Sequence, residues 1–575
     1  MKHTLLIILL GSLFLSVYSF AQTQTADFDF AKAEQVIEAV MQQQIDDPET
    51  QEQACAIASL VGVYQFRQHR YESAAKTLEY AISHSRLTDG TLQIQNHVFL
   101  IHALCLTHDR RALSWLQRLV PMLQDLQRNT VRGDFPVEYA DGMRSVMNNL
   151  LLPLSSLVSR SFPDNETLGY CFNLMLFLKQ FAFHQLAGRN QSDLKHSLFL
   201  DYRKLLAAQL RTGEVVIEFV PCMDIDQGSL IATNYVAYLL DHKGQVELVE
   251  VCNKADVEAL SLHNESPWLL YKSARLSALV WERLVTHVAG KQRIYLSPCG
   301  ILNRVNFLLL DDRIYELTSA SELLKTYPAN THADALLIGD IDYDQSIVST
   351  IRSDRDWGQL SATKIEIESI AKALSPHYAL TKLTHDTATE TAVMQLCNHS
   401  PQILHFATHA ICYTDSLRRS QQGFFDFPYD YNPERRELTF CGLVLSGGNL
   451  GFRLSGNRPL NNDGILLSDE ISKLRLDSTT LVVLSACNSA NGIFDDIEGT
   501  FGLVRAFKLA GAKTIIASLS KVDDDAISEF MSYFYHRLST NESLHDAFLA
   551  TIIHMKDKYP AQPKFWTSFK MIDSW

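Results

Sequence analysis

The chain has 575 residues, of which 46% are hydrophobic and 20% are charged, a composition typical of a globular protein with two or more domains. A formal net charge of −14 argues against a general nucleic-acid-binding surface, so no nucleic-acid partner is expected. After the N-terminal residues, no stretch reaches the roughly 18 uninterrupted apolar residues that a membrane-spanning helix needs.

The N-terminus has the pattern of a secretory signal peptide. Lys2 precedes an apolar run that begins at Leu5, and the small residues Ser19 and Ala21 stand at the −3 and −1 positions of a cleavage site. We therefore expect residues 1–21 to be removed, the protein to be exported to the periplasm or the extracellular space, and no membrane span to remain. An uncleaved N-terminus that anchors the protein in a membrane is the alternative.

The ten cysteines are spread along the chain and include no Cys-x-x-Cys pair. A disulfide framework or a zinc site would depend on closely spaced cysteines, so neither is indicated. The chain also has no glycine-rich phosphate-binding loop. We expect most of the thiols to be buried and unreactive, and we expect neither a metal nor a cofactor.

Residues 22–204 are predicted to form an α-helical domain, because apolar residues recur at three- and four-residue spacing without strand-like alternation. Gly62, Ala74 and Ala81 are small residues that would let two antiparallel helices approach closely. Together with Leu78, their spacing resembles a tetratricopeptide repeat, which would offer a surface to a protein partner or substrate. The alternative is an ordinary helical bundle.

After Gly213 the pattern changes to strands alternating with helices. Strand, helix and strand in succession predict an α/β fold, a mostly parallel sheet covered by helices on both faces. We divide this part at residue 330, into 205–330 and 331–575. Strands are expected at 214–220, 235–240, 246–251, 293–298, 335–340, 402–408, 480–486 and 513–519, and helices at 268–288, 363–374 and 499–510.

Two of these strands end on reactive side chains, His409 and Cys487. The carboxyl ends of strands in a parallel sheet are where loops diverge and ligands bind. A thiol and an imidazole at two such ends are the parts of a cysteine nucleophile with its general base. Each also has a structural alternative, a buried cysteine or a packing histidine that merely ends a strand. His405 is a rival base, but its position inside the strand favours a packing role.

The same two strands resemble those of a known family. The run from Ile403 to His409 resembles the LHFATHG strand of the CHAT domain, a caspase-like peptidase module found with tetratricopeptide repeats. The run from Leu484 to Asn488 resembles the LSAC nucleophile strand of that family. Further similar motifs follow in the family's order over roughly residues 205–575. The resemblance implies a caspase-like fold, with 205–330 as the non-catalytic part of a CHAT domain and 331–575 as the catalytic part.

The resemblance also implies roles for individual residues. His409 would be the general base and Cys487 the nucleophile that attacks a peptide bond and forms a thioester. Backbone N–H groups of Cys487 and Ala410 would form the oxyanion hole. The chain departs from the family pattern at Ala410, which replaces a glycine, at Ser520, which replaces a tryptophan, and at Asn306, which replaces a proline. Ala410 matters most, because alanine cannot freely adopt positive φ.

These patterns predict an exported caspase-like cysteine endopeptidase that cleaves a protein or peptide substrate. A catalytically inactive CHAT-like scaffold for protein–protein interaction is the alternative, favoured by the departure at Ala410. Asp463 and Glu498 are candidate pocket residues for a basic side chain of the substrate. The polar segment 412–462 carries two arginine pairs and is a candidate site of self-cleavage.

Overall fold

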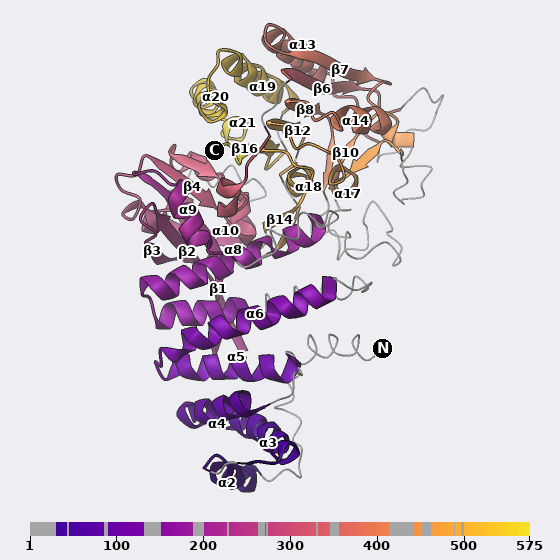
Figure 1. Cartoon of the computed structure of the whole chain (residues 1–575). Coiled ribbons are helices and arrows are strands. Elements are labelled where there is room, and N and C mark those ends of the chain that lie inside the picture. Colours follow the sequence, from indigo (N-terminus) through magenta and orange to yellow (C-terminus); the bar gives the residue numbers. More distant parts are fainter. Residues whose placement is uncertain are drawn as a thin grey trace.

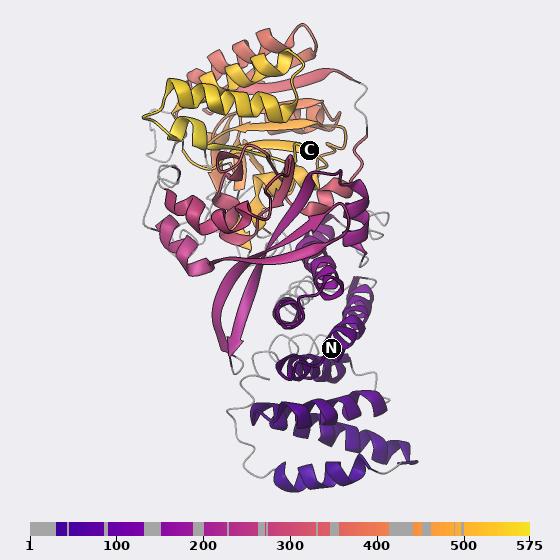
Figure 2. The ribbon, with the colours of Figure 1, turned by 90° about the vertical axis from the view of Figure 1, so that its left-hand side faces the viewer.

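The chain consists of a stack of helices at its N-terminal end, followed by two sheet-containing parts that pack on each other (Figures 1 and 2). Residues 1–21, the expected signal peptide, lie outside the residues that the structure describes. The computed structural model describes residues 30–42, 45–85, 90–131, 151–187, 200–226, 229–262, 271, 274–328, 332–344, 356–412, 441–450, 462–487, 489–490, 492–495, 499–521 and 523–575.

The N-terminal part is helical. From α2 to α6, each helix packs against the next one in the chain. Residues 151–161 form one further helical segment in this part. The labelled helices are α2 (Phe30–Val40), α3 (Pro48–Arg67), α4 (Tyr71–His84), α5 (Gly90–Leu106), α6 (Arg111–Val131), α8 (Asn165–Ala187) and α9 (Tyr202–Gln209).

Helices α3 and α4 approach each other closely at the small residues that the sequence singles out. A Cβ atom on Gly62 would lie 2.6 Å from Cγ of Leu78, so a larger residue at this position would force the helices apart. Ala74 and Ala81 are buried in the same helix pair. The close antiparallel packing expected of these residues is therefore present, while their assignment to a tetratricopeptide repeat stays a prediction.

The middle part contains a five-stranded sheet with the strand order β3-β2-β1-β4-β5. β1, β2 and β3 pair antiparallel, whereas β4 and β5 extend the sheet in parallel. One face packs against the N-terminal helices and the other against three short helices. The elements are β1 (Glu214–Asp226), β2 (Ser229–Asp241), β3 (Val246–Asn253), α10 (Lys254–Leu262), α11 (Ala274–Val280), α12 (Glu282–Val285), β4 (Arg293–Ser297), β5 (Ile314–Glu316) and the 3-10 helices η3 (Gly300–Arg304), η4 (Phe307–Leu309) and η5 (Ala320–Leu324).

The C-terminal part contains a six-stranded sheet with the order β16-β15-β12-β8-β6-β7. All neighbouring strands are parallel except the edge strand β16. Alternate side chains of the strands enter two separate cores, one on each face of the sheet. The strands are β6 (Asp334–Ile341), β7 (Ala379–His385), β8 (Ile403–Ala407), β12 (Leu481–Ser485), β15 (Thr514–Ser518) and β16 (Phe569–Ile572).

Helices cover both faces of this sheet (Figure 1). The longer helices α13, α19 and α20 pack on one face, and the shorter helices α14, α17 and α18 pack on the other. Their bounds are α13 (Ala362–Leu374), α14 (Glu390–Cys397), α17 (Ser468–Ile471), α18 (Leu503–Leu509), α19 (Asp524–Ser539), α20 (Leu544–Lys558) and α21 (Lys564–Thr567). Smaller sheets are formed by β9 (Ala410–Cys412), β10 (Cys441–Val444) and β11 (Ile465–Leu467), and by β13 (Gly492–Asp495) and β14 (Gly499–Gly502).

This architecture confirms the predicted fold class, helices followed by a mostly parallel sheet with helices on both faces. Two predicted helices differ in detail. The helix expected over 499–510 begins as strand β14, and α18 starts only at Leu503, because the glycines at both ends of β14 are poor helix formers. Within 268–288 the described helices are two short ones, α11 and α12, separated at Trp281.

Buried lysine–carboxylate pairs join the three parts of the chain. Lys179 Nζ on α8 lies 2.5 Å from Glu218 Oε1 on β1, with both side chains almost fully enclosed. Lys508 Nζ on α18 lies 3.2 Å from Glu322 Oε2 on η5 and 3.0 Å from Asp573 Oδ2. Lone buried charges are costly, so each pair holds its two elements in a fixed relation.

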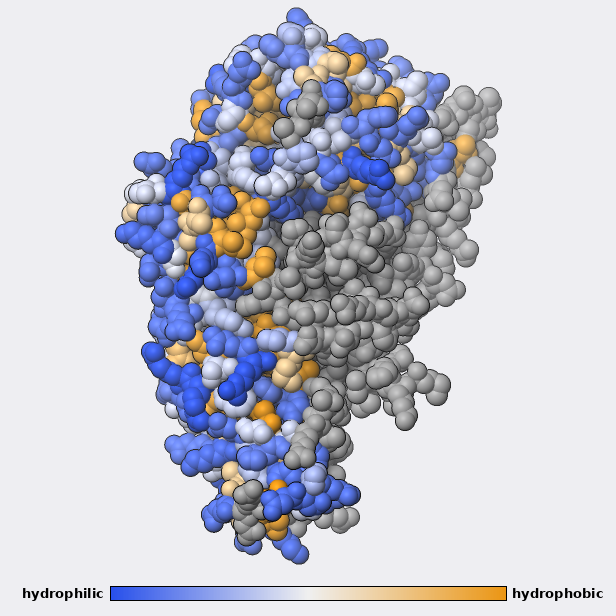
Figure 3. Space-filling model, viewed as in Figure 1, coloured by the Kyte–Doolittle hydropathy of each residue, from blue (hydrophilic) through white to orange (hydrophobic). Residues whose placement is uncertain are grey.

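The face of the protein seen in Figure 3 is mainly hydrophilic, with hydrophobic side chains gathered in small groups. Within the described ranges, none of the helices has both the length and the apolar character of a membrane span.

Candidate active site

His409 and Cys487 follow two adjacent parallel strands, β8 and β12, at the carboxyl end of the sheet. In the pairing of β8 with β12, Ala407 and Ser485 are Cα partners, and the N–H of Thr408 continues the ladder to the carbonyl oxygen of Ser485 at 3.3 Å. His409 and Cys487 each come two residues after this aligned pair. Because neighbouring strands lie about 4.8 Å apart, the register brings the backbones of His409 and Cys487 to neighbouring positions.

The His409 ring is held by a backbone carbonyl. Its Nε2 lies 2.8 Å from the carbonyl oxygen of Gly358, an atom that can only accept a hydrogen bond. Nε2 therefore carries the hydrogen, and Nδ1 of the neutral ring keeps its lone pair. The ring of Tyr343 packs beside the imidazole, with 5.1 Å between the ring centroids. These two contacts fix the tautomer and the orientation of His409.

Asn449 clamps the segment that supplies this carbonyl. Its Oδ1 accepts a hydrogen bond from the Trp357 N–H at 2.7 Å, and its Nδ2 donates to the Trp357 carbonyl oxygen at 3.0 Å. Nδ2 also donates to Asp344 Oδ1 at 2.9 Å, and the Asn449 N–H donates to the Tyr343 carbonyl oxygen at 3.0 Å. The buried Asn449 thus ties Trp357, the neighbour of Gly358, to the chain at Tyr343.

The electrostatic surroundings keep His409 neutral. Burial is the largest effect and lowers the pKa of its imidazole. The Gly358 carbonyl and the Asp524 carboxylate raise that pKa again, and the Lys521 ammonium lowers it. Asp524 is the first residue of α19, so this helix start delivers a carboxylate to the histidine. A neutral imidazole with an exposed lone pair is the form that a general base requires.

Cys487 is distinguished from the other described thiols by its accessibility. Eight cysteines are in no disulfide, and seven of these are buried whereas Cys487 is half-buried. The loop after it is anchored by Ser489, whose hydroxyl donates to the Leu484 carbonyl oxygen at 3.1 Å and accepts from the Ser518 N–H at 2.9 Å. Ser489 thus ties the chain after the accessible Cys487 to β12 and β15.

The backbone at Ala410 is extended and its N–H is directed away from β10. In the antiparallel pairing of β9 with β10, Ala410 stands opposite Leu443, and the Val444 N–H donates to the His409 carbonyl oxygen at 2.9 Å. This pattern makes Ala410 and Leu443 a non-hydrogen-bonded pair, so the Ala410 N–H is left for another acceptor. Ala410 is not among the residues with positive φ. Alanine therefore fits here without strain.

A disulfide-bonded cysteine lies in the same small sheet as Ala410. It is Cys441, and its Cα partner in the pairing of β9 with β10 is Cys412. The prediction that most cysteines are buried, unreactive thiols does not cover every cysteine, and no spacing in the sequence singles out Cys441.

Of the expected substrate-pocket residues, Asp463 is described and Glu498 lies outside the described residues. Asp463 is 7% exposed, and its Oδ1 accepts a hydrogen bond from the Ile465 N–H at 3.0 Å. It belongs to an acidic group with Glu390 and Glu470, whose carboxyl pKa values are each raised to about 7, mainly by burial. The Asp463 carboxylate is therefore directed into the protein's own chain.

His405 is fully buried inside β8. Its Nε2 lies 2.9 Å from Glu366 Oε1 on α13, and its Nδ1 lies 3.1 Å from the Tyr535 hydroxyl on α19. Both ring nitrogens are used within the core of one sheet face. His405 thus joins two covering helices to the strand that carries His409.

The residues that hold His409 are not recognisable in the sequence. Gly358, Tyr343 and Asn449 are far from His409 along the chain and belong to no motif of catalytic spacing. Asp524 does lie in a run of three aspartates at a helix start, a pattern that could have drawn attention to it.

Residues 270–574, just over half of the chain, match the family model of the CHAT domain. The chain belongs to the CHAT domain family. This confirms the resemblance seen in the two strands and, with it, a caspase-like fold. The match begins at 270, whereas the sequence suggested a domain start at 205, so β1, β2 and β3 precede it.

Solved structures add two similarities. Separase of Saccharomyces cerevisiae, in its complex with securin, is 9% identical with a TM-score of 0.46, and the match covers 98% of this chain and 50% of the separase chain. The Arg-specific cysteine proteinase gingipain R is 13% identical with a TM-score of 0.32, covering 52% of this chain and 68% of its own. This chain thus spans about half the length of the separase chain. No curated protein matches it in sequence.

Proposed function

We propose that this CHAT domain protein is an exported cysteine endopeptidase that works through a Cys487–His409 dyad. The observation that carries the proposal is the shared register of the two strand ends, which supports a dyad of the half-buried Cys487 with the neutral, oriented His409. Family membership supports the peptidase class.

The proposed reaction begins at Nδ1 of His409, which takes the proton of the Cys487 thiol. The thiolate attacks the carbonyl carbon of the scissile peptide bond, and the N–H groups of Cys487 and Ala410 stabilise the developing oxyanion. The imidazolium then gives its proton to the leaving amine. Water, deprotonated by the same imidazole, hydrolyses the thioester and restores the thiol. No third catalytic side chain is needed, because the Gly358 carbonyl orients the ring.

Export and partner binding are the less direct parts of the proposal. The disulfide at Cys441 supports an oxidising compartment, where such bonds persist. The N-terminal helices supply an extended stack with room for a protein partner or substrate (Figure 2). For a basic residue before the cleaved bond, Asp524 is a better candidate than Asp463, because its charge acts on His409.

Profiling on a peptide library tests the activity. We expect the full chain to cleave, and we expect both Cys487→Ala and His409→Ala to abolish cleavage. Cys55→Ala, which removes a buried thiol of α3, and His385→Ala, which removes an exposed histidine at the end of β7, are the matched controls and should remain active. The library also reports the charge preference next to the cleaved bond.

Labelling with an electrophilic thiol probe separates the peptidase from an inactive scaffold. An activated Cys487 should account for most of the labelling, so Cys487→Ala should lose it and Cys55→Ala should keep it. Unchanged labelling in Cys487→Ala, together with no cleavage of any peptide, would mean that the domain serves protein–protein interaction. Fractionation of cells that produce the full chain, compared with a chain lacking residues 1–21, tests export.

A further inference from the structure

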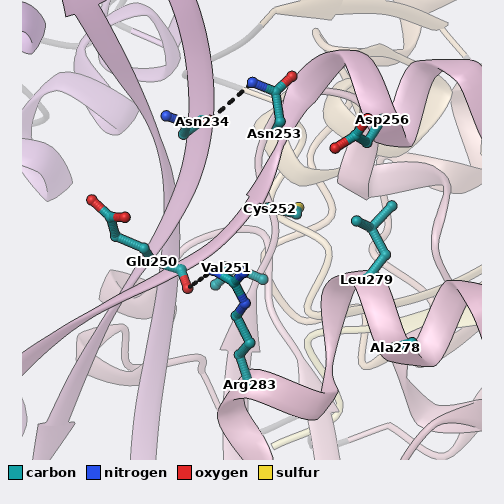
Figure 4. A pocket seen from close by; sticks show the side chains of 9 residues that line it. All are labelled: Asn234, Glu250, Val251, Cys252, Asn253, Asp256, Ala278, Leu279 and Arg283. Carbon is teal, nitrogen blue, oxygen red and sulfur yellow. Dashed lines mark hydrogen bonds between the residues drawn. The ribbon is translucent and has the colours of Figure 1, made fainter.

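A cavity of about 310 Å³ lies on the five-stranded sheet, and Figure 4 shows the side chains that line it. Its described lining comes from β2, β3 and the helices α10, α11 and α12. Small-molecule sites in proteins commonly have volumes from about 300 Å³ upward. The cavity is therefore large enough for a small metabolite.

A β-bulge in β3 forms the floor of this cavity. Tyr235 pairs with Cys252 and Val236 pairs with Glu250, which leaves Val251 as an extra residue in β3. In a regular strand, side chains alternate, so Cys252 would point to the same face as the exposed Glu250. Because of the bulge, Val251 and Cys252 are instead both buried in the core beneath the helices. Bulges re-aim side chains and occur often beside functional sites.

Two side chains of opposite charge border the cavity without touching each other. Arg283 on α12 uses one guanidinium nitrogen, Nη1, to donate to the Glu250 carbonyl oxygen at 3.2 Å. Asp256 on α10 makes no hydrogen bond or ion pair within the part of the chain that the structure describes. Glu250 does not compensate Arg283, because its carboxylate is turned away and lies 3.1 Å from Arg160 (Figure 4).

The two charges flank the same sulfur atom. Burial raises the pKa of the Cys252 thiol to about 12, Asp256 raises it further and Arg283 opposes the rise. The Cys252 thiol is therefore uncharged. The Asp256 carboxylate and the Arg283 guanidinium both lie near enough to influence its pKa. Figure 4 shows Asp256 and Arg283 projecting from different helices, on opposite sides of Cys252.

The rest of the lining is a polar edge and an apolar wall. Asn253 Nδ2 donates to Asn234 Oδ1 at 3.0 Å, so this amide pair is fixed. Ala278 and Leu279 on α11 form an apolar side. An ammonium group would satisfy Asp256, a carboxylate would satisfy Arg283 in a charge-assisted hydrogen bond, and an aliphatic side chain would cover Leu279.

We propose that this cavity is a binding site for a free α-amino acid with an aliphatic side chain. A ligand with a single charge could engage only one of these two exposed side chains, whereas a zwitterion can engage both. The proposal is independent of the peptidase activity, because binding is measured without turnover.

Isothermal titration calorimetry of the full chain with leucine, leucinamide and N-acetylleucine tests the site. Leucine is expected to bind, and each blocked ligand should bind at least about tenfold more weakly, because each lacks one charge-assisted hydrogen bond. Arg283→Gln should bind leucine as weakly as the wild type binds leucinamide. Asp256→Asn should bind leucine as weakly as the wild type binds N-acetylleucine.

Matched controls lie on helices α11 and α12, which both line the cavity. Arg275→Gln on α11 and Glu282→Gln on α12 change exposed charges that do not line the cavity, and leucine binding should be unaltered in both. Thermal unfolding of each variant shows whether it is folded. Absence of leucine binding at millimolar concentration, equal binding of the blocked ligands, or unchanged affinity in folded Arg283→Gln and Asp256→Asn would each overturn the proposal.

Discussion

Ala407 and Ser485 stand opposite each other in the parallel pairing of β8 with β12, and each precedes the reactive residue of its strand by two positions. This register is fixed by the cores, because Phe406 and Leu484 both enter the core on one face of the sheet. A slip of one residue would turn these side chains to the opposite face. The neighbouring backbone positions of His409 and Cys487 are therefore set by the packing of the sheet.

The N–H of Ala410 is expected to be an oxyanion donor, which substitution by proline tests. Proline removes the N–H without breaking the ladder with β10, because this N–H is directed away from that strand. Removing one oxyanion donor costs about 10²–10³-fold in kcat. Ala410→Pro should therefore lose that factor with peptide substrates. Ala410→Gly keeps the N–H and needs no positive φ, so its kcat should stay close to that of the wild type.

The sequence predicted the two strand ends well, because apolar runs of strand length followed by a polar residue reflect burial on both faces of a parallel sheet. It also placed His405 inside the strand, where the structure buries it against Glu366. The support of His409 could not be predicted in the same way. Gly358 contributes a backbone carbonyl and Asn449 acts through Trp357, and neither contact depends on a motif.

Asn449 is expected to position His409 through the Trp357–Gly358 segment. Asn449→Ala removes the hydrogen bonds to Trp357, so the Gly358 carbonyl should be held less firmly. The variant should therefore lower kcat more than it raises KM. Because that carbonyl raises the pKa of His409, its loss should also move the acid limb of the pH–rate profile to lower pH.

Asn306→Ala is the control for Asn449→Ala. Asn306 is equally buried and donates to the Phe569 carbonyl oxygen at 2.7 Å, on the edge strand β16. Its loss should lower thermal stability but leave the acid limb where it is. Identical pH profiles for Asn449→Ala and the wild type would contradict a positioning role.

The charges around His409 are expected to shift its titration in opposite directions. Asp524 raises the pKa of the imidazole and Lys521 lowers it. Asp524→Asn should therefore move the acid limb of kcat/KM to lower pH, and Lys521→Gln should move it to higher pH. Asp525→Asn changes a carboxylate in the same helix turn without a direct effect on His409 and should leave the limb unchanged. High salt should reduce both shifts, since exposed charges are screened.

The buried His405–Glu366 pair is expected to stabilise the sheet as a unit. Glu366→Leu leaves a buried imidazole nitrogen without its partner, and an unsatisfied buried polar group costs about 1–3 kcal/mol in the free energy of unfolding. The double variant His405→Leu/Glu366→Leu should be less destabilised than the sum of the two single variants, as urea unfolding can measure. Additive losses would show that the two side chains are not coupled.

Glu390 and Glu470 are expected to make stability depend on pH near neutrality. Burial first, and then nearby carboxylates, raise both pKa values from an ordinary 4.5 to about 7. Between these values the folded chain binds more protons than the unfolded chain, so the stabilising contribution is present at low pH and is lost as pH rises through 7. Glu470→Gln removes one charge and keeps an acceptor for the Leu467 N–H.

Thermal unfolding at two pH values should therefore separate Glu470→Gln from the wild type. At pH 8 the variant should unfold at a higher temperature, because the cost of burying the ionised Glu470 carboxylate is removed and the repulsion within the acidic group is relieved. At pH 5 the two should be alike, because the carboxyl group is then already neutral in the folded wild type. Glu368→Gln, which alters an exposed carboxylate paired with Lys382 at 2.9 Å, should give no gain at pH 8. A gain for Glu470→Gln that persists at pH 5 would show that repulsion between ionised carboxylates is not its cause.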